Sequence, residues 1–199
     1  MTQFTIHTTE TASEGARPML EMLKSKNGFV PNILGAMADA PGVLKSYLDI
    51  AGNIAAGTLS NTEQQVIQIT TSRLNGCEYC VAAHSTIAKG QKVDAEVLEA
   101  VRHQKPIADT KLEALRQFTT TMVDKQGWVT EGDIQSLLQA GYTRGQVLEV
   151  VLSMTLKFLT NTVNHVVQTP IDAQFAPQHL AFKETSCCGG GCHSDKMAS

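Results

Sequence analysis

Residues 143–168 carry the longest helical pattern in the chain, and this pattern constrains the fold more than any other feature. The segment contains no proline, and its apolar side chains cover most of the helix circumference: Val147, Leu148, Val150, Val151, Leu152, Met154, Leu156, Phe158 and Leu159. A helix that is apolar on so many sides must be surrounded by other elements or covered by a neighbouring subunit. The pattern therefore predicts a buried helix.

The remainder of the chain also predicts helices. Apolar side chains recur with helical spacing in eight further segments that end at glycine, proline or polar residues: 16–27, 33–40, 43–56, 60–75, 77–90, 94–103, 109–125 and 130–140. No segment alternates with period two. Aromatic residues make up only 5% of the 199 residues, which favours close helix packing over a β-sandwich. The sequence predicts an all-α, single-domain helical bundle.

Composition divides the chain into three parts. Residues 1–15 are polar and predict an N-terminal arm, whereas residues 16–175 predict the helical domain with a core motif at 59–90. Residues 176–199 contain three consecutive glycines and predict a flexible tail rich in cysteine and glycine.

Charge and hydropathy exclude several classes of partner. The formal net charge of −3 gives no reason to expect nucleic acid or an anionic membrane. No apolar run reaches the roughly 18 residues of a membrane span, and the first residues lack the pattern of a secretory signal. We expect a cytoplasmic protein, whose cysteines meet a reducing compartment. There a Cys-x-x-Cys pair is more often catalytic or metal-binding than structural.

Such a pair lies at Cys77 and Cys80, and His84 follows one turn later. On a helix these three positions share one face. Cys77 is expected near the helix N-terminus, where free N–H groups favour a thiolate, and His84 is expected to hold or take the proton of Cys80. A thiolate attacks electrophiles, so the pattern predicts redox chemistry with hydrogen peroxide or an organic hydroperoxide.

The dipeptide Asn75-Gly76 separates two predicted helices that would run antiparallel. Residue 65 and His84 lie at comparable distances from this break, so the helical rise allows them to face each other. A proton relay between Gln65 and His84 is therefore geometrically possible.

The segment from Leu59 through Asn75-Gly76 and the two cysteines to Ala82-Ala83-His84 resembles the alkylhydroperoxidase D-like branch of the carboxymuconolactone decarboxylase family. The resemblance is weaker over 148–152, 161–165 and 169–172. It implies an all-α fold, a homo-oligomer (trimer or hexamer) and thiol peroxidase activity. By position, it implies that Cys80 is the peroxidatic thiol, Cys77 the resolving thiol and His84 a member of the proton relay. An external dithiol or thioredoxin-like reductant would complete the cycle, and no cofactor is expected to be required.

One position departs from the family pattern, which has a glutamate twelve residues before the first cysteine. Here that position is Gln65, and an amide cannot take up a proton at neutral pH. Glu63 points to another side of the helix, and Glu78 would contribute only if its side chain turned inward. We therefore expect slower or differently tuned peroxidase turnover than a glutamate at this position would give.

The tail carries a second group of metal-ligand residues: Cys187, Cys188, Cys192 and His193. Thiols and an imidazole separated by glycine can wrap zinc, copper(I) or a trivalent metalloid. Two alternatives are open for the tail. Its cysteines have no defined ligand, or they relay electrons to the Cys77–Cys80 disulfide by thiol exchange.

Alternatives are also open for the core motif. The two cysteines could be inert buried residues, or they could bind zinc together with His84. His165 near Asn161 and Asn164 is either a second polar contribution to the pocket or a core or interface histidine. For the whole chain, the alternatives to a peroxidase are a soft-metal or metalloid-binding protein and a lyase acting on a lactone related to carboxymuconolactone.

Overall fold

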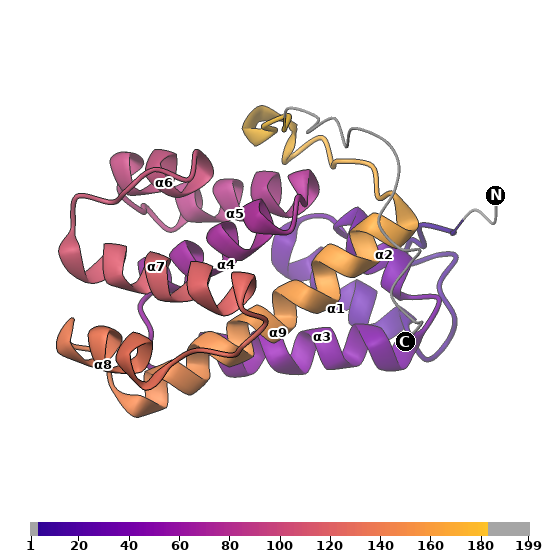
Figure 1. Cartoon of the computed structure of the whole chain (residues 1–199). Helices are drawn as coiled ribbons and strands as arrows, with labels where there is room; N and C mark the ends of the chain where they lie inside the picture. Colours follow the sequence, from indigo (N-terminus) through magenta and orange to yellow (C-terminus); the bar gives the residue numbers. More distant parts are fainter. Residues whose placement is uncertain (1–3, 183–199) are drawn as a thin grey trace, which may run out of the picture.

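A computed structural model describes residues 4–182 and confirms the all-α prediction. The described residues form nine α-helices, one 3₁₀ turn and no strand (Figure 1). The helices are α1 (Arg17–Asn27), α2 (Asn32–Met37), α3 (Pro41–Ala55), α4 (Asn61–Leu74), α5 (Glu78–Gly90), α6 (Ala95–Arg102), α7 (Thr110–Asp124), α8 (Glu131–Gln139) and α9 (Arg144–Val167), and the 3₁₀ turn is η1 (Ala176–Gln178). None of these helices combines the length and the apolar character that crossing a membrane requires.

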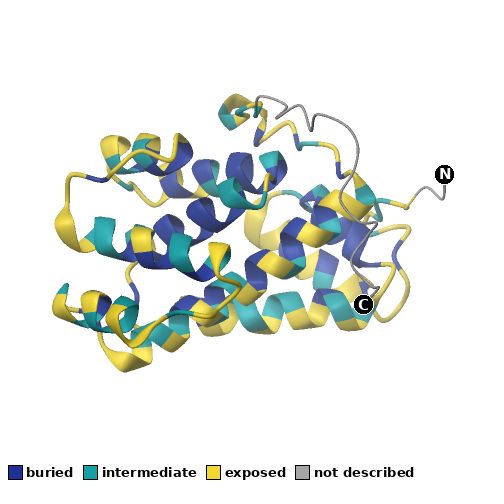
Figure 2. Cartoon of the chain, in the orientation of Figure 1, coloured by how far each residue is buried: buried dark blue, intermediate teal, exposed yellow. Residues whose placement is uncertain are grey.

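Helix α4 is the centre of the fold. Residues 63–72 of this helix are all buried, since α5, α6, α7 and α9 pack around it (Figure 2). Helix α9 is less buried than its apolar sequence predicts. It buries one stripe, which runs from Val150 to Asn164, and it exposes Leu148, Phe158 and Val166. The central element is therefore α4, and α9 is amphipathic in the single chain.

The buried side chains form two clusters that meet at α5. The first joins α1, α2 and α3 to the start of α5 and includes Cys77 and Cys80. The second joins α4 to α6, α7, α8 and α9 and includes Val81 and Ala88 from α5. The cysteine pair thus lies where the two halves of the core join, on a helix that both halves hold in place.

The segments before α1 and after α9 both pack on the helical domain. Ala12 is buried, and the backbone N–H of His7 donates to the carbonyl of Gly35 in α2. A Cβ at position 35 would lie 2.6 Å from the His7 carbonyl oxygen, so this close approach requires glycine.

The predicted tail begins at residue 176, and the structure describes its first residues, 176–182. The segment 176–182 is packed on the domain, because the Glu78 carboxylate accepts hydrogen bonds from the His179 ring and from the backbone N–H of Phe182. The side chain of Arg73 also stacks on the Phe182 ring, at 3.9 Å from its centroid. The four proposed tail ligands lie outside the described residues.

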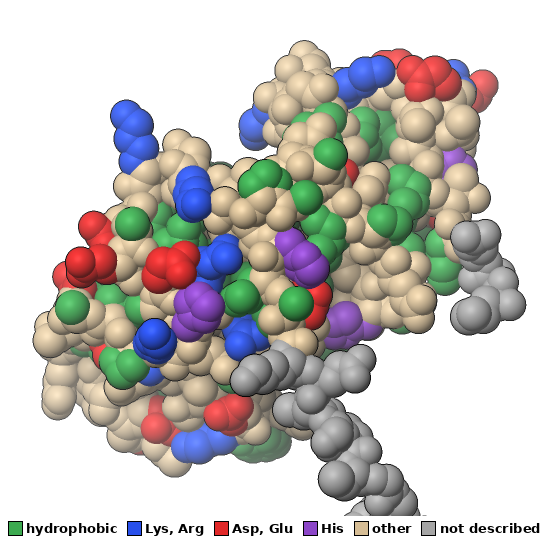
Figure 3. Space-filling view, turned by 90° about the horizontal axis from the view of Figure 1, so that it is seen from above, with side chains coloured by type: hydrophobic (Ala, Val, Ile, Leu, Met, Phe, Trp, Pro, Cys, Tyr) green, Lys and Arg blue, Asp and Glu red, His purple; other side chains and the backbone are tan. Residues whose placement is uncertain are grey.

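The surface shows no large field of one sign on the face drawn in Figure 3, where Lys and Arg side chains are interspersed with Asp and Glu. This distribution agrees with the small net charge of −3.

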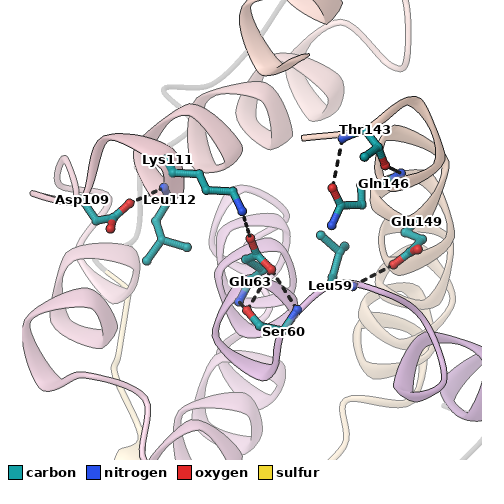
Figure 4. A network of polar contacts seen from close by, with 9 residues as sticks. All are labelled: Leu59, Ser60, Glu63, Asp109, Lys111, Leu112, Thr143, Gln146 and Glu149. Atoms are coloured by element: carbon teal, nitrogen blue, oxygen red, sulfur yellow. Dashed lines mark hydrogen bonds and ion pairs between the residues drawn. The ribbon is translucent and has the colours of Figure 1, made fainter. Parts of the chain in front are cut away.

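Polar contacts fix the starts of α4 and α9 relative to each other (Figure 4). The predicted capping box is present: Ser60 accepts from the backbone of Glu63, whose carboxylate accepts from the backbone and hydroxyl of Ser60. Lys111 of α7 pairs with Glu63 at 3.1 Å. Glu149 of α9 accepts from the backbone N–H groups of Thr58 and Leu59. These contacts hold the N-terminal ends of the two helices that flank α5.

We predict that Glu63→Gln destabilises the fold by about 1 kcal/mol at neutral pH, because it removes a charge from a helix N-terminus and from Lys111. Burial acts to raise the pKa of Glu63, but its bonds to Ser60 and Lys111 outweigh burial and lower the pKa. A lowered folded-state pKa stabilises above the unfolded pKa, and this contribution is lost as the pH falls through the folded value.

Urea unfolding at pH 7 and at about pH 3 measures this effect, since pH 3 lies below the ordinary glutamate pKa of the unfolded chain and the contribution of the charge is smaller there. The difference between wild type and variant should shrink toward zero in acid. The control is Glu21→Gln, at an exposed position beyond the first turn of α1, and it should change stability little at either pH. A pH-independent loss in Glu63→Gln would show that its charge is not the cause.

Candidate active site

The two cysteines lie at the first turn of α5, directly after the Asn75-Gly76 break. Gly76 has a φ of 68°, a left-handed conformation that glycine adopts without strain, and it redirects the chain from α4 into α5. Cys77 is the N-cap of α5, and its sulfur accepts a long hydrogen bond of 3.4 Å from the backbone N–H of Cys80. Both side chains are free thiols and 2% exposed. The spacing therefore places the two sulfurs side by side, as the sequence predicts.

Helix α9 supplies polar groups to both sulfurs. The side-chain amide of Asn164 lies 3.2 Å from the sulfur of Cys80 and 3.6 Å from that of Cys77. The hydroxyl of Thr160 lies 3.8 Å from the sulfur of Cys80. Hydrogen-bond donors that face a sulfur stabilise its thiolate form. Of the residues considered at 161–165, Asn164 thus belongs to the site, whereas His165 is exposed.

His84 faces Gln65, as the antiparallel arrangement of α4 and α5 predicts. Its Nδ1 lies 2.9 Å from the side-chain oxygen of Gln65, whose amide nitrogen donates to the side-chain oxygen of Gln91 at 3.1 Å. The other ring nitrogen, Nε2, lies 2.5 Å from the Nζ atom of Lys157. Both ring nitrogens are therefore engaged away from the sulfurs, and the expected direct bond between His84 and Cys80 is not formed.

Lys157 is the site residue that the sequence reasoning missed. It lies on α9, is 2% exposed and reaches the same cavity as Cys80 and His84. The sequence did contain a signal, because Lys157 falls in line with Val150, Asn161 and Asn164 on one face of the apolar segment. A lysine on a buried helix face is uncommon unless it is paired.

The electrostatics of the site favour a thiolate at Cys80 rather than at Cys77. Burial acts to raise the pKa of Cys80, but the Cys77 thiol, the charge of Lys157 and the Thr160 hydroxyl outweigh it, so the pKa of Cys80 is lowered. The hydrogen bond that Cys77 donates to Cys80, together with burial, raises the pKa of Cys77. The backbone N–H at the helix start acts to lower the pKa of Cys77, but it does not outweigh these two effects.

Burial and the adjacent Lys157 charge lower the pKa of His84 well below 6.5. Burial also lowers the pKa of Lys157, against the opposing effect of the Cys80 and Cys77 sulfurs. At neutral pH the imidazole of His84 is therefore neutral, and it lies beside the buried side chain of Lys157.

A cavity of about 420 Å³ is lined by Cys80. Its walls are mainly apolar and come from α1, α2, α3, the α1–α2 connection and the segment after α9: Leu23, Phe29, Ile33, Leu34, Leu48 and Phe175. The polar side chains that line it include His84 and Lys157, which contact each other. This volume lies within the range of small-molecule sites, about 300–1,000 Å³. Cys80 is buried, and a substrate could reach it through this cavity.

The two other carboxylates considered for the relay lie outside the site. Glu63 belongs to the capping box of α4, and Glu78 is bound to the segment after α9. Within residues 4–182, no group of three metal-binding side chains gathers at one place. For Cys77, Cys80 and His84 this follows from the ring of His84, which contacts Gln65 and Lys157 instead of the sulfurs.

The model of the carboxymuconolactone decarboxylase family matches residues 41–121, which include Gln65, both cysteines and His84. The match covers less than half of the 199 residues, and over that part the chain is similar to this family. The matched region ends before α9, so it does not reach Lys157 or Asn164. No curated protein matches the chain by sequence.

Solved structures share the fold. A peroxidase-related protein with an alkylhydroperoxidase AhpD core, from Ralstonia eutropha JMP134, is 21% identical with a TM-score of 0.79, over 87% of this chain and 93% of that one. A peroxidase-related protein from Silicibacter sp. TM1040 is 20% identical with a TM-score of 0.74, over 83% and 89% of the two chains. A cysteine variant of the debrominase Bmp8, in complex with 2,3,4-tribromopyrrole, is 17% identical with a TM-score of 0.71, over 89% and 96%.

We predict that Gln65→Glu makes Cys80 less reactive. The added carboxylate would compete with the thiolate for the positive charge of Lys157, through His84, and would raise the pKa of Cys80. The pH midpoint of Cys80 alkylation should rise by about one unit, so alkylation at a pH below the wild-type midpoint should slow by roughly ten-fold. Peptide mapping after a timed iodoacetamide reaction measures this rate.

The matched control is Gln91→Glu, which keeps the acceptor for Gln65 but places the charge at an exposed position. Its alkylation rate should stay close to that of wild type. Equal or faster alkylation of Gln65→Glu would contradict the expected role of charge at this position.

Proposed function

We propose that the protein is a thiol-dependent peroxidase that reduces organic hydroperoxides with Cys80 and Cys77. The observation that carries the proposal is the placement of Cys80 at the end of an apolar cavity, with its pKa lowered beside Lys157 and a second thiol in contact. A thiolate with a lowered pKa is the nucleophilic form of cysteine. The match of residues 41–121 to the family model and the fold shared with peroxidase-related proteins support this proposal.

In the proposed reaction, the Cys80 thiolate attacks the terminal oxygen of the hydroperoxide. The O–O bond breaks, an alcohol leaves, and Cys80 becomes a sulfenic acid. The Cys77 thiol then condenses with this sulfenic acid, which releases water and forms the Cys77–Cys80 disulfide. An external dithiol, such as a thioredoxin-like protein, reduces the disulfide by thiol exchange.

Replacing each cysteine tests the proposal directly. Peroxide treatment of wild type should form the Cys77–Cys80 disulfide rapidly, and Cys80→Ser should form none. Cys77→Ser should retain the attack but accumulate a sulfenic acid at position 80, which dimedone traps. Mass spectrometry of the peptides distinguishes the disulfide, the dimedone adduct and the unmodified cysteine. If Cys80 of the wild type stays reduced in peroxide but still reacts with iodoacetamide, peroxide is excluded as the substrate.

The cavity favours a medium-sized apolar hydroperoxide over hydrogen peroxide. Ala51 of α3 lines the cavity, so Ala51→Phe should reduce its volume without touching the sulfurs. We predict that kcat/KM for cumene hydroperoxide falls by about ten-fold, which corresponds to ~1.4 kcal/mol. The value for hydrogen peroxide should change less than about two-fold, because this substrate needs little space.

Ala55→Phe is the matched control, since Ala55 lies one turn later on α3 at an exposed position. Both rates should remain near those of wild type in this variant. An equal fall in kcat/KM for both substrates in Ala51→Phe would mean that the cavity does not select substrates by size.

Reductive dehalogenation is the second candidate function. It is favoured by the fold shared with Bmp8, which is a debrominase, and by the apolar cavity beside a dithiol. The same two thiols would supply two electrons: the carbon–bromine bond becomes carbon–hydrogen, bromide leaves, and the disulfide forms. Bromide release from 2,3,4-tribromopyrrole, measured with a dithiol reductant, separates this activity from peroxide reduction.

Further proposals concern the whole protein and its tail. We propose that the protein is a cytoplasmic homo-oligomer that needs no metal or cofactor for turnover and acts without nucleic acid or membrane partners. The apolar side chains that α9 exposes would lie at a subunit contact. For the tail, Cys187, Cys188, Cys192 and His193 would bind a soft metal or metalloid. Metal analysis of the reduced full chain and of a chain truncated after Glu184 tests this site.

A further inference from the structure

Lys157 is a buried cation for which the described part of the chain provides no carboxylate. Its side chain is 2% exposed, and none of the ion pairs within residues 4–182 includes it. A buried ammonium is strongly disfavoured unless an opposite charge and hydrogen bonds compensate it. The opposing negative charges are those of the Cys80 and Cys77 sulfurs. Because Cys80 is the thiol with the lowered pKa, its thiolate is the counter-ion of Lys157.

The hydrogen bonds around His84 determine which of its nitrogens carries the proton. The amide nitrogen of Gln65 donates to Gln91, so the oxygen of Gln65 must accept from Nδ1–H of His84. Nε2 then has a free lone pair and accepts from the ammonium of Lys157. His84 is therefore neutral, and its only proton points away from the cavity.

We propose that Lys157 is the proton donor of the reaction, and that His84 and Gln65 are positioning residues that orient its ammonium. The proposal rests on the peroxidase function described above. When the Cys80 thiolate attacks, the O–O electron pair goes to the leaving alkoxide. The alkoxide takes a proton from Lys157, which yields the alcohol and a neutral amine. Charge is conserved, because a thiolate and an ammonium are consumed together.

The remaining steps restore the amine. The proton of Cys77 leaves with the sulfenic oxygen as water, so the disulfide form contains a neutral Lys157. An external dithiol brings two protons when it reduces the disulfide. One returns to Cys77, and the other returns to Lys157 as the Cys80 thiolate re-forms. The charge of Lys157 is thus coupled to the oxidation state of the cysteine pair.

The other titratable groups around the cavity are poor donors for this step. Tyr79 of α5 donates its hydroxyl to Asp172, and burial with that bond raises its pKa. Burial raises the pKa of Tyr47 of α3 to about 12. Lys26 lines the cavity from α1 and is exposed, so it lies at the solvent side. Lys157 is the acid that shares the polar end with Cys80.

Two substitutions separate charge from proton transfer. Lys157→Arg keeps a positive charge but cannot release a proton, since the arginine pKa lies above about 12. Lys157→Met keeps the length of the side chain but removes both properties. Iodoacetamide alkylation of Cys80 reports the thiolate, because iodide leaves without a proton. Reduction of cumene hydroperoxide requires the proton as well. Lys89→Met is the matched control at an exposed position of α5.

For Lys157→Met we expect the pH midpoint of Cys80 alkylation to rise by more than one unit, so that alkylation at a pH below the wild-type midpoint slows by at least about ten-fold. For Lys157→Arg we expect alkylation within about three-fold of wild type. Hydroperoxide reduction should fall in both variants by roughly a hundred-fold, the scale of general acid catalysis. Lys89→Met should match wild type in both assays, and circular dichroism checks that each variant is folded.

Three results would overturn parts of the proposal. Hydroperoxide reduction by Lys157→Arg at the wild-type rate would exclude Lys157 as the proton donor. Unchanged alkylation of Lys157→Met would exclude its pairing with the Cys80 thiolate. A wild type that is alkylated normally but reduces no hydroperoxide would overturn the peroxidase function and the donor role with it, and the alkylation results alone would then decide the ion pair.

Discussion

The electrostatic pairing of Lys157 with Cys80 depends on three helices that must be held in register. Helix α4 supplies Gln65, α5 supplies both cysteines and His84, and α9 supplies Lys157 and the amide of Asn164. The groups in this arrangement are partly or fully buried, so each needs a partner at a fixed distance. The fold around them can be understood as the support that maintains those distances.

Two sets of contacts outside the cavity provide this support. At one end, the carboxylates of Glu63 and Glu149 bind backbone groups at the start of α4, and Glu149 does so from α9. At the other end, the side-chain amide of Asn75 donates to the oxygen of Asn161 on α9 at 2.9 Å. The amide of Asn161 in turn contacts Ser72 on α4. The turn that places Cys77 at the start of α5 is thus fixed to the same helix that carries Lys157.

The sequence predicts most of this fold, because the helices within residues 4–182 begin and end at local signals. Capping boxes, prolines at first turns and the Asn75-Gly76 break determine these ends, and they act over a few residues. The side of α9 that is buried could not be predicted in the same way, since its apolar residues occur on all sides. Packing against α4 decides it, and that contact joins residues almost ninety positions apart, as in the bond between Asn161 and Ser72.

The same distinction applies to the site. Cys77, Cys80, His84 and Gln65 lie on two consecutive helices, so a helical spacing and one turn suffice to bring them together. Lys157 and Asn164 reach the sulfurs only through tertiary packing, and no local motif marks them. The sequence therefore does not show which groups lower the pKa of Cys80. The helix N-terminus acts on Cys77, but the groups from α9 act on Cys80.

The charge of Lys157 changes the effect expected of Gln65 on the Cys80 thiolate. A glutamate at position 65 would bind Nδ1–H of His84, and through His84 it would offer a negative charge to Lys157. The ammonium would then have two anionic partners, and the thiolate would lose part of its stabilisation. With the uncharged Gln65, the thiolate is the sole anion that compensates Lys157 at the polar end of the cavity. The amide at 65 and the lysine at 157 are therefore complementary features. Together they keep the site electrically neutral while Cys80 remains ionised, which a carboxylate at position 65 beside the same lysine would not allow.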